Sequence, residues 1–313
     1  MSLSKQDILQ VKARGFLRNR GTDRFSGRVV SVGGVYSADA LCAIAECAER
    51  FGSGDVIFTS RLSAEIVGIP FEKITEAEQF LQARGLSFGG TGAKIRPITA
   101  CKGTTCVFGN INTRAIAEAL HKTFYVDMAD VSLPHKFKIG VGGCPNSCMK
   151  PSLNDVGIEG HRAARFDREK CRGCRVCAVS TACPSGAIRV VDGKADVDTA
   201  RCRNCGVCAG KCPFDAFADH SDGYCIITVG GTWGKIRRDG TPLSRPVPTD
   251  EVIPTVEKIL LWYRENGYVK ERLGATVDRV GMDKLEAAVF GNDLIRRREA
   301  ILAAPLLTRP EAK

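Results

Sequence analysis

Twelve of the fifteen cysteines fall into four spaced groups, and in a reducing compartment such groups hold metal centres. Two groups form a tandem of C-x2-C-x2-C runs, each closed by Cys-Pro: Cys171, Cys174, Cys177 and Cys183, then Cys202, Cys205, Cys208 and Cys212. The other two groups are pairs, Cys101 with Cys106 and Cys144 with Cys148. Twelve thiolates make three four-cysteine sites, so the sequence predicts three [4Fe–4S] clusters and a protein that transfers electrons.

The tandem resembles the two-cluster bacterial ferredoxins over residues 163–222. In that pattern the fourth cysteine of each run binds the other cluster. The resemblance implies one cluster on Cys171, Cys174, Cys177 and Cys212, and a second on Cys202, Cys205, Cys208 and Cys183. A pair of zinc sites is the alternative, but C-x2-C-x2-C followed by Cys-Pro is a poor spacing for tetrahedral zinc.

Composition limits where such a protein works and what it binds. No apolar run reaches the roughly 18 residues of a membrane span, and the first residues contain no apolar signal region, so we expect a cytoplasmic protein. The formal charge of +10 could indicate nucleic-acid binding. Each four-thiolate cluster, however, contributes roughly −2, so internal anions and an anionic substrate explain the excess better than a DNA-binding surface.

The elements around the tandem predict one α+β domain that the tandem interrupts. We expect a first part at 1–162, a ferredoxin-like insert at 163–222, and a continuation with C-terminal helices at 223–313. Strands are predicted at 27–33, 55–60, 136–142, 154–159 and 224–229. Helices are predicted at 37–52, at 112–122, at 250–266 and from a capping box at Thr75–Glu78 to Gly85.

Two lysines share one face of the strand predicted at 136–142. Because side chains alternate along a strand, Lys136 and Lys138 point one way, whereas Phe137, Ile139 and Val141 point the other way. Two neighbouring ammonium groups repel each other. Their face is therefore either plainly solvated or a site for an anion.

The cysteine pairs resemble the cluster-binding motifs of the siroheme-dependent sulfite and nitrite reductase family. The matching motifs are Cys101-Lys-Gly-Thr-Thr-Cys106 and Gly143-Cys144-Pro-Asn-Ser-Cys148. The resemblance implies a third cluster on Cys101, Cys106, Cys144 and Cys148, with Cys148 also bridging to the siroheme iron. The first pair is spaced C-x4-C where the commoner family form is C-x5-C, and Gly103 eases this shorter turn.

Basic residues extend the resemblance to the substrate. The Lys136–Lys138 segment resembles the family's paired substrate-binding lysines, and Arg96 and Arg28 resemble its substrate arginines. Arg61 resembles the arginine that contacts the siroheme carboxylates. The resemblance thus implies catalytic roles for Arg28, Arg96, Lys136 and Lys138, and cofactor binding by Arg61 and Cys148.

The resemblance covers most of 13–162 and continues through 223–285. Family members of full length carry two homologous halves, whereas this chain has one half plus the ferredoxin-like insert. That compact form is most similar to the siroheme subunit of anaerobic sulfite reductase. It implies six-electron reduction of sulfite to sulfide. Alternatives are nitrite reduction to ammonia on the same fold, or an electron-transfer subunit without siroheme catalysis.

The resemblance also implies partners. Sulfite is the expected small-anion substrate, and the expected electron source is a donor protein or a flavoprotein or iron–sulfur subunit. Because a single half carries both the cations and the cluster cysteines, we expect a homo-oligomer or a heteromeric complex.

Metal content tests the cluster assignment. Iron and acid-labile sulfide should correspond to three [4Fe–4S] clusters per chain plus one further iron in an extractable tetrapyrrole. Elemental and labile-sulfide analysis of anaerobically purified protein measures this. Only two clusters, or zinc at either run of the tandem, would contradict the assignment.

Overall fold

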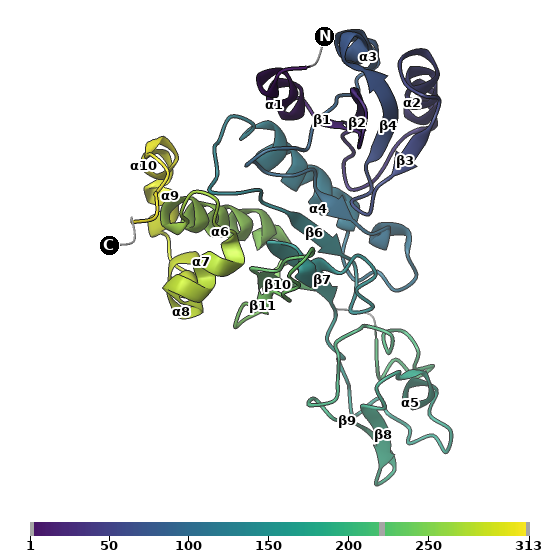
Figure 1. The fold of residues 1–313 in the computed structure, drawn as a ribbon. Coiled ribbons are helices and arrows are strands. Elements are labelled where there is room, and N and C mark those ends of the chain that lie inside the picture. Colours follow the sequence, from purple (N-terminus) through teal and green to yellow (C-terminus); the bar gives the residue numbers. More distant parts are fainter. Residues whose placement is uncertain (1–2, 219–222, 311–313) are drawn as a thin grey trace.

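The computed structural model describes residues 3–218 and 223–310 in three parts (Figure 1). An N-terminal α/β unit lies at one end, a second sheet with the C-terminal helices forms the middle, and the cysteine-rich module projects at the other end. None of the helices in these ranges is both long enough and apolar enough to cross a membrane.

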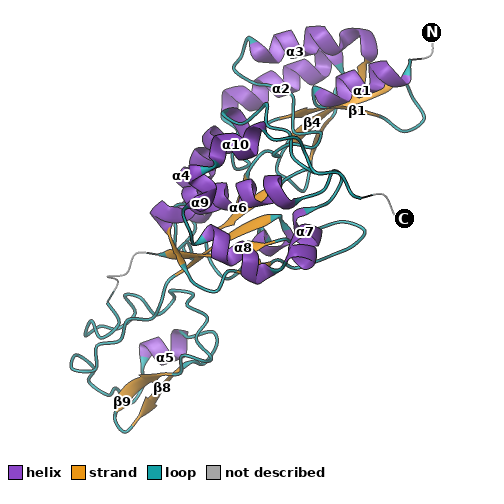
Figure 2. Ribbon diagram, turned by 90° about the vertical axis from the view of Figure 1, so that its left-hand side faces the viewer, coloured by secondary structure: helices purple, strands orange, loops and turns teal. Residues whose placement is uncertain are grey.

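The N-terminal unit is an antiparallel sheet with helices on one face (Figure 2). Its strands run in the order β1–β2–β4–β3: Phe16–Arg18, Arg24–Val29, Ala64–Pro70 and Val56–Phe58. Its helices are α1 (Lys5–Ala13), α2 (Ala38–Phe51) and α3 (Ile74–Gln82). The apolar face of α2 packs on the sheet and helps form a core separate from that of the rest of the chain.

The start of α2 is capped as predicted, whereas the start of α3 is not. The Ser37 side chain accepts a hydrogen bond from the Ala40 N–H at 3.1 Å and so caps α2. The capping box predicted at Thr75 is wrong. A 3₁₀ turn at Phe71–Lys73 leads directly into α3, and the Thr75 hydroxyl instead accepts a hydrogen bond from Arg14.

The middle part is built on a mixed sheet whose strands come from both sides of the insert. Its main order is β11–β10–β7–β6–β5, and β12 is also paired to β10. The strands are β5 (Thr99–Ala100), β6 (Ile139–Gly142), β7 (Val156–His161), β10 (Tyr224–Val229), β11 (Thr241–Pro242) and β12 (Val247–Pro248). β5, β6 and β7 are parallel, and β10 is antiparallel to β7. α4 (Thr113–Leu120), extended by a π-helical turn at His121–Val126, and α6 (Val252–Asn266) pack in the same core.

The strand predicted at 136–142 begins later than expected, at Ile139. Residues 136–138 precede it and lie outside the named strand, although Phe137 makes an isolated bridge to Ile95 and the carbonyl of Lys138 accepts a hydrogen bond from the N–H of Val156. The predicted alternation nevertheless holds, because Phe137, Ile139 and Val141 are fully buried while Lys136 and Lys138 are half-buried.

Four short helices surround α6 at the C-terminal end, namely α7 (Leu273–Val280), α8 (Met282–Val289), α9 (Asp293–Arg296) and α10 (Arg298–Ala303). α6 is buried along much of its length, including Leu260, Trp262 and Tyr263. The segment beyond α10 returns to this core, because the N–H of Val269 donates to the carbonyl of Leu307 at 2.8 Å.

The cysteine-rich module leaves and rejoins the middle sheet at one point. The chain departs after His161 at the end of β7 and returns at Tyr224 at the start of β10, and these two residues are paired. The module has a helix, α5 (Ala178–Ala182), a hairpin of β8 (Ile188–Val191) and β9 (Lys194–Val197), and a small core of its own.

Candidate active site

The parallel pair β5–β6 carries one cysteine at the end of each strand. Cys101 follows β5, and its N–H donates to the carbonyl of Val141 in β6 at 2.9 Å. Cys144 follows β6 after Gly143, whose N–H donates to the Cys101 sulfur at 3.1 Å. Gly143 and Gly103 pack backbone against backbone, where an added side chain on either would collide with the other. The two cysteine loops are thus held in contact.

All four cysteines of the predicted third cluster come together. Burial raises the pKa of the Cys144 thiol, and a backbone hydrogen bond from Asn146 lowers it in part. The neighbouring sulfurs of Cys101, Cys106 and Cys148 also raise this pKa. Cys148 is exposed at the edge of this group. A set of thiols that destabilise one another's charge is suited to bind a cation-rich core.

Four of the module cysteines, which the ferredoxin pattern assigns to one cluster, lie around one cavity. Cys183, Cys202, Cys205 and Cys208 line one small cavity of about 20 Å³. Burial raises the pKa of Cys208 to about 11, and the sulfurs of the other three act in the same direction. The four remaining module cysteines are Cys171, Cys174, Cys177 and Cys212, the predicted other set. Among the described residues, no three His, Cys, Asp or Glu side chains lie close enough together to bind one metal ion. A [4Fe–4S] core does not need such a group, because each of its four irons takes one thiolate.

Asn110 joins the module to the loops of the third cluster, and the sequence offered no signal for it. Its backbone N–H donates to the carbonyl of Gly143 at 2.8 Å, next to Cys144. Its side-chain amide donates to the carbonyl of Cys205 at 3.3 Å and lies 3.4 Å from that of Gly160. One buried residue therefore contacts two of the proposed cluster loops.

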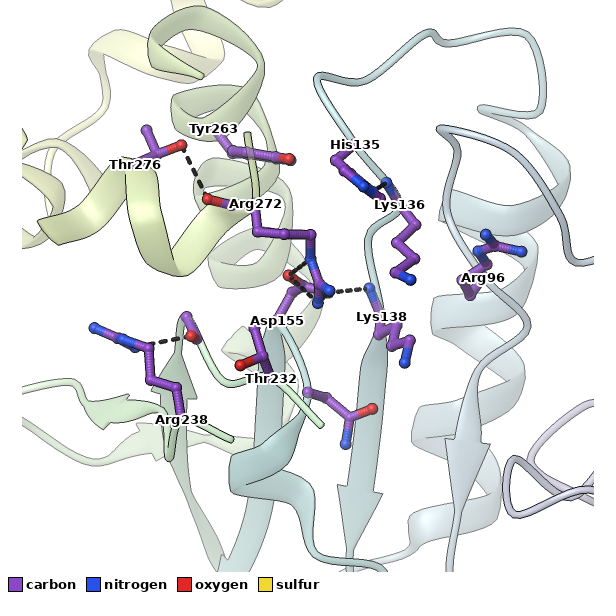
Figure 3. A network of polar contacts seen from close by, with 12 residues as sticks. Arg96, His135, Lys136, Lys138, Asp155, Thr232, Arg238, Tyr263, Arg272 and Thr276 are labelled. Carbon is purple, nitrogen blue, oxygen red and sulfur yellow. Dashed lines mark hydrogen bonds and ion pairs between the residues drawn. The ribbon is translucent and has the colours of Figure 1, made fainter. Parts of the chain in front are cut away.

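The opposite end of the β5–β6 pair carries the predicted cations. The N–H of Arg96 donates to the carbonyl of Phe137 at 2.8 Å, which sets Arg96 beside Lys136 and Lys138 (Figure 3). In the part of the chain that the structure describes, neither ammonium group has a hydrogen-bond or ion-pair partner, and the buried Nε of Arg96 also has none. Among the described residues, no carboxylate forms an ion pair with Lys136, Lys138 or Arg96.

Burial and mutual repulsion make these cations easier to deprotonate. The pKa of Lys138 is lowered to about 8, first by burial and then by Arg61, Lys136 and Arg272. The pKa of Lys136 is lowered for the same reasons, and those of Arg96 and Arg61 are lowered to about 10. An anion placed among them would restore the favourable balance of charge.

Arg28 and Arg61 lie in the same region but have partners. Arg28 forms an ion pair with Glu65, with Nη2 2.5 Å from Oε1, so its charge is partly neutralised. Arg61 donates to the side-chain oxygen of Asn154 at 3.0 Å and to the carbonyl of Pro97 at 2.9 Å. Both arginines are held in fixed orientations.

A buried ion pair anchors the lysine segment from behind, and sequence reasoning missed it. Asp155, which is 0% exposed, accepts two hydrogen bonds of 2.8 Å from Arg272 and one of 2.9 Å from the N–H of Lys138 (Figure 3). Arg272 arrives from the C-terminal helices. An acidic residue at the start of an apolar strand could have identified Asp155, whereas nothing in the sequence marks Arg272.

Two adjoining cavities meet at Cys148 and Met149. One, of about 520 Å³, is lined by six cationic side chains, Arg28, Arg61, Arg96, Lys136, Lys138 and Lys150, and by no carboxylate of the described residues. The other, of about 390 Å³, has a mainly apolar lining that includes Val32, Val35 and Leu62. This combination fits a flat tetrapyrrole with apolar faces and carboxylates on its edge, next to a cysteine cluster.

Comparison with known families agrees with these features. Residues 91–296 match the family described as the nitrite and sulphite reductase 4Fe-4S domain. Residues 18–84 match the nitrite/sulfite reductase ferredoxin-like half domain. The first match covers more than half of the chain, so the protein belongs to the nitrite and sulphite reductase family. The family and the α+β fold class predicted from the sequence are confirmed.

Two relatives show how the chain compares in length. It is 31% identical over 255 residues to the coenzyme F420-dependent sulfite reductase of Methanocaldococcus jannaschii, covering 80% of this chain but only 40% of that protein. It is 30% identical over 253 residues to one subunit of the anaerobic sulfite reductase of Salmonella typhimurium, covering 73% of this chain and 71% of the relative.

Solved structures support the fold. A crystal structure of dissimilatory sulfite reductase I superimposes with a TM-score of 0.68 at 22% identity, over 92% of this chain and 73% of that one. The Mycobacterium tuberculosis NirA protein gives a TM-score of 0.66 at 17% identity, over 100% of this chain and 50% of that one.

The Arg272→Ala variant tests the anchor behind the lysines. Removing Arg272 leaves the Asp155 carboxylate buried without its counter-charge, so we expect a loss of about 3–5 kcal/mol in the free energy of unfolding. Chemical denaturation followed by tryptophan fluorescence measures it.

Arg237→Ala is the control, because it removes an exposed ion pair with Asp239 and should cost at most about 1 kcal/mol. Equal losses in the two variants would contradict the anchoring role of Arg272.

Proposed function

We propose that this chain is a sulfite reductase subunit that carries siroheme and reduces sulfite to sulfide with electrons delivered through its ferredoxin-type clusters. The observation that carries the proposal is a cationic cavity lined by Cys148 and by two lysines, Lys136 and Lys138, whose ammonium groups have no partner among the described residues. An electron relay alone would have no use for such a cavity. The named activities of the two relatives are consistent with it.

The proposed cofactors are three [4Fe–4S] clusters and one siroheme. Cys101, Cys106, Cys144 and Cys148 would hold the cluster beside the siroheme, with Cys148 shared between the two. The module cysteines would hold the other two clusters, and Arg61 would bind carboxylates at the macrocycle edge. When bound, the siroheme supplies the metal centre and the redox chemistry.

The chain's own residues would bind the oxyanion and supply protons. Lys136, Lys138 and Arg96 present positive charge in a cavity that no carboxylate of the described residues lines, and Arg28 adds a charge that Glu65 partly neutralises. Each loss of oxygen from sulfite consumes protons. A lysine whose pKa is lowered to about 8 releases a proton more readily than an ordinary lysine, so Lys138 is the proposed donor.

The Lys136→Ala and Lys138→Ala variants test the function. Each should lower sulfite turnover by about 1–3 kcal/mol, the value of a charge-assisted contact, while the siroheme absorption remains. Steady-state assays with an artificial reductant, on sulfite and on nitrite, measure the effect and the substrate preference.

Lys138→Arg is the matched control because it keeps the charge. Only protonated Lys138 attracts the anion, so the KM of the wild type for sulfite should rise as pH passes about 8. In Lys138→Arg that rise should move to higher pH. Loss of siroheme from the alanine variants, or nitrite turnover without sulfite turnover, would contradict the proposal.

We place the protein in the cytoplasm, because cysteine ligands need a reducing compartment.

We also propose that it works as an assembly. The edge strand β3 exposes Ile57 and Phe58, which are 55% and 62% accessible, close to the Thr59–Arg61 lining of the cationic cavity. Apolar side chains on an edge strand favour a protein neighbour, either a second copy or a related protein.

Complementation tests a site shared between two copies. A Lys136→Ala chain and a Cys148→Ser chain, each impaired alone, should together recover about one wild-type site per mixed dimer if cations and cluster come from different copies. Activity assays on purified mixed dimers measure this. No recovery in verified mixed dimers would mean that each chain completes its own site.

A further inference from the structure

Asn110 lies at the contact between the cysteine-rich module and the middle part of the chain, and it is 8% exposed. Its backbone N–H donates to the carbonyl of Gly143 at 2.8 Å, and its side-chain amide donates to the carbonyl of Cys205 at 3.3 Å. A buried amide costs free energy unless its polar atoms are hydrogen-bonded. The Asn110 side chain therefore depends on a carbonyl of the module for part of its stability.

Glycines on both sides of the contact leave room for Asn110. A side chain added at Gly206, in the module, would collide with the Asn110 side-chain oxygen. A side chain added at Gly223, where the chain returns from the module, would collide with the Asn110 carbonyl. The absence of a side chain at both positions lets the module backbone approach Asn110 closely.

The other cysteine run of the module offers an internal comparison for Gly206. Residues 171–177 read Cys-Arg-Gly-Cys-Arg-Val-Cys and residues 202–208 read Cys-Arg-Asn-Cys-Gly-Val-Cys, so Arg175 stands at the position of Gly206. Gly206 has a positive φ of 75°, whereas Arg175 does not have a positive φ. A cysteine run of this spacing therefore does not require glycine at this position. The contact with Asn110 explains why Gly206 is a glycine.

The contact brings together two cysteine loops that are proposed to bind different clusters. Asn110 bonds to Cys205 on one side and, through Gly143, to the peptide before Cys144 on the other side. The N–H of Gly143 in turn donates to the Cys101 sulfur at 3.1 Å. Because the module projects from the end of the molecule (Figure 1), its position depends on the contacts at this junction. Electron tunnelling slows steeply as two centres move apart, so a contact that fixes their separation also controls the rate.

We propose that Asn110 is a positioning residue that sets the rate of electron transfer from the module to the third cluster. This inference rests on the proposed function and assigns the step by which electrons reach its active site. In that step one electron leaves the module cluster that includes Cys205 and enters the third cluster, and no bond forms or breaks. Asn110 holds the two ligand loops at one separation, as residues that hydrogen-bond to the ligands do at other metal sites.

The Asn110→Ala variant tests the proposal, because it removes the bond to Cys205 and keeps the backbone bond to Gly143. The anaerobic holoprotein is reduced with photoreduced deazaflavin and mixed with sulfite, and freeze-quench electron paramagnetic resonance follows oxidation of the module clusters. This oxidation should be several-fold slower in the variant than in the wild type. The magnetic interaction between the reduced module clusters and the reduced third cluster, measured without sulfite, should weaken.

Gly206→Ala is a second variant that acts from the module side of the contact. The added methyl group would push the Cys202–Cys208 loop away from an intact Asn110, so it should also slow the transfer and weaken the magnetic interaction. Iron and labile-sulfide contents equal to those of the wild type show that the clusters are retained in both variants.

Asn266→Ala is the matched control, because the Asn266 amide also donates to a backbone carbonyl, that of Trp262 at 2.9 Å. This hydrogen bond lies within α6, away from the module. The control should leave the transfer rate and the magnetic interaction unchanged, since it removes a similar bond without loosening the contact between the cysteine loops.

Three outcomes would overturn the proposal. These are an unchanged transfer rate in both Asn110→Ala and Gly206→Ala, equal slowing in Asn110→Ala and Asn266→Ala, or slower transfer with an unchanged magnetic interaction. If sulfite withdraws no electrons from the wild type, the proposed function is refuted. The magnetic interaction needs no sulfite, so it tests the position that Asn110 sets even in that case.

Discussion

The parallel pairing of β5 with β6 is the constraint on which the site depends. At the carboxyl end of the pair, Cys101 and the Gly143–Cys144 turn are joined through the Cys101 sulfur. At the amino end, the Arg96–Phe137 hydrogen bond places Arg96 beside the two lysines. Because both strands are short and their register is fixed, the end with the proposed cluster cysteines and the end with the cations lie one strand length apart. A shift in the register of β5 against β6 would therefore misplace the cysteines at one end and the cations at the other end at the same time.

The module extends this arrangement without disturbing it. It is inserted between β7 and β10, which pair with each other. His161 and Tyr224, at the two ends of the insertion, are direct partners in that pairing. The Cys202–Cys208 loop of the module then contacts Asn110, whose N–H donates to the carbonyl of Gly143, next to Cys144. A chain of hydrogen bonds therefore connects the two loops, and the cationic cavity lies beyond the second of them.

Local patterns in the sequence predicted the family, the cysteine groups and the lysine face, because ligand spacing and strand alternation act over a few residues. They failed where the structure depends on distant partners. The Asp155–Arg272 pair joins residues 117 positions apart, and no local pattern records it. The helix start predicted at Thr75 was wrong because the 3₁₀ turn at Phe71–Lys73 leads directly into α3 at Ile74, which places Thr75 inside the helix. The strand predicted from residue 136 begins at Ile139, because residues 136–138 are held by an isolated bridge from Phe137 to Ile95 and by hydrogen bonds that Lys138 makes with Asp155 and Val156 instead of a continuous ladder.

We propose that the cationic cavity and the cysteines around Cys148 serve one tetrapyrrole that binds sulfite. The visible spectrum of the anaerobically purified protein during titration with sulfite tests this. We expect absorption bands toward the red, beyond the broad iron–sulfur absorption, that shift on addition of sulfite in the wild type and shift only at higher sulfite in Lys138→Ala. Iron–sulfur absorption alone, unchanged by sulfite, would mean that the protein holds no such tetrapyrrole.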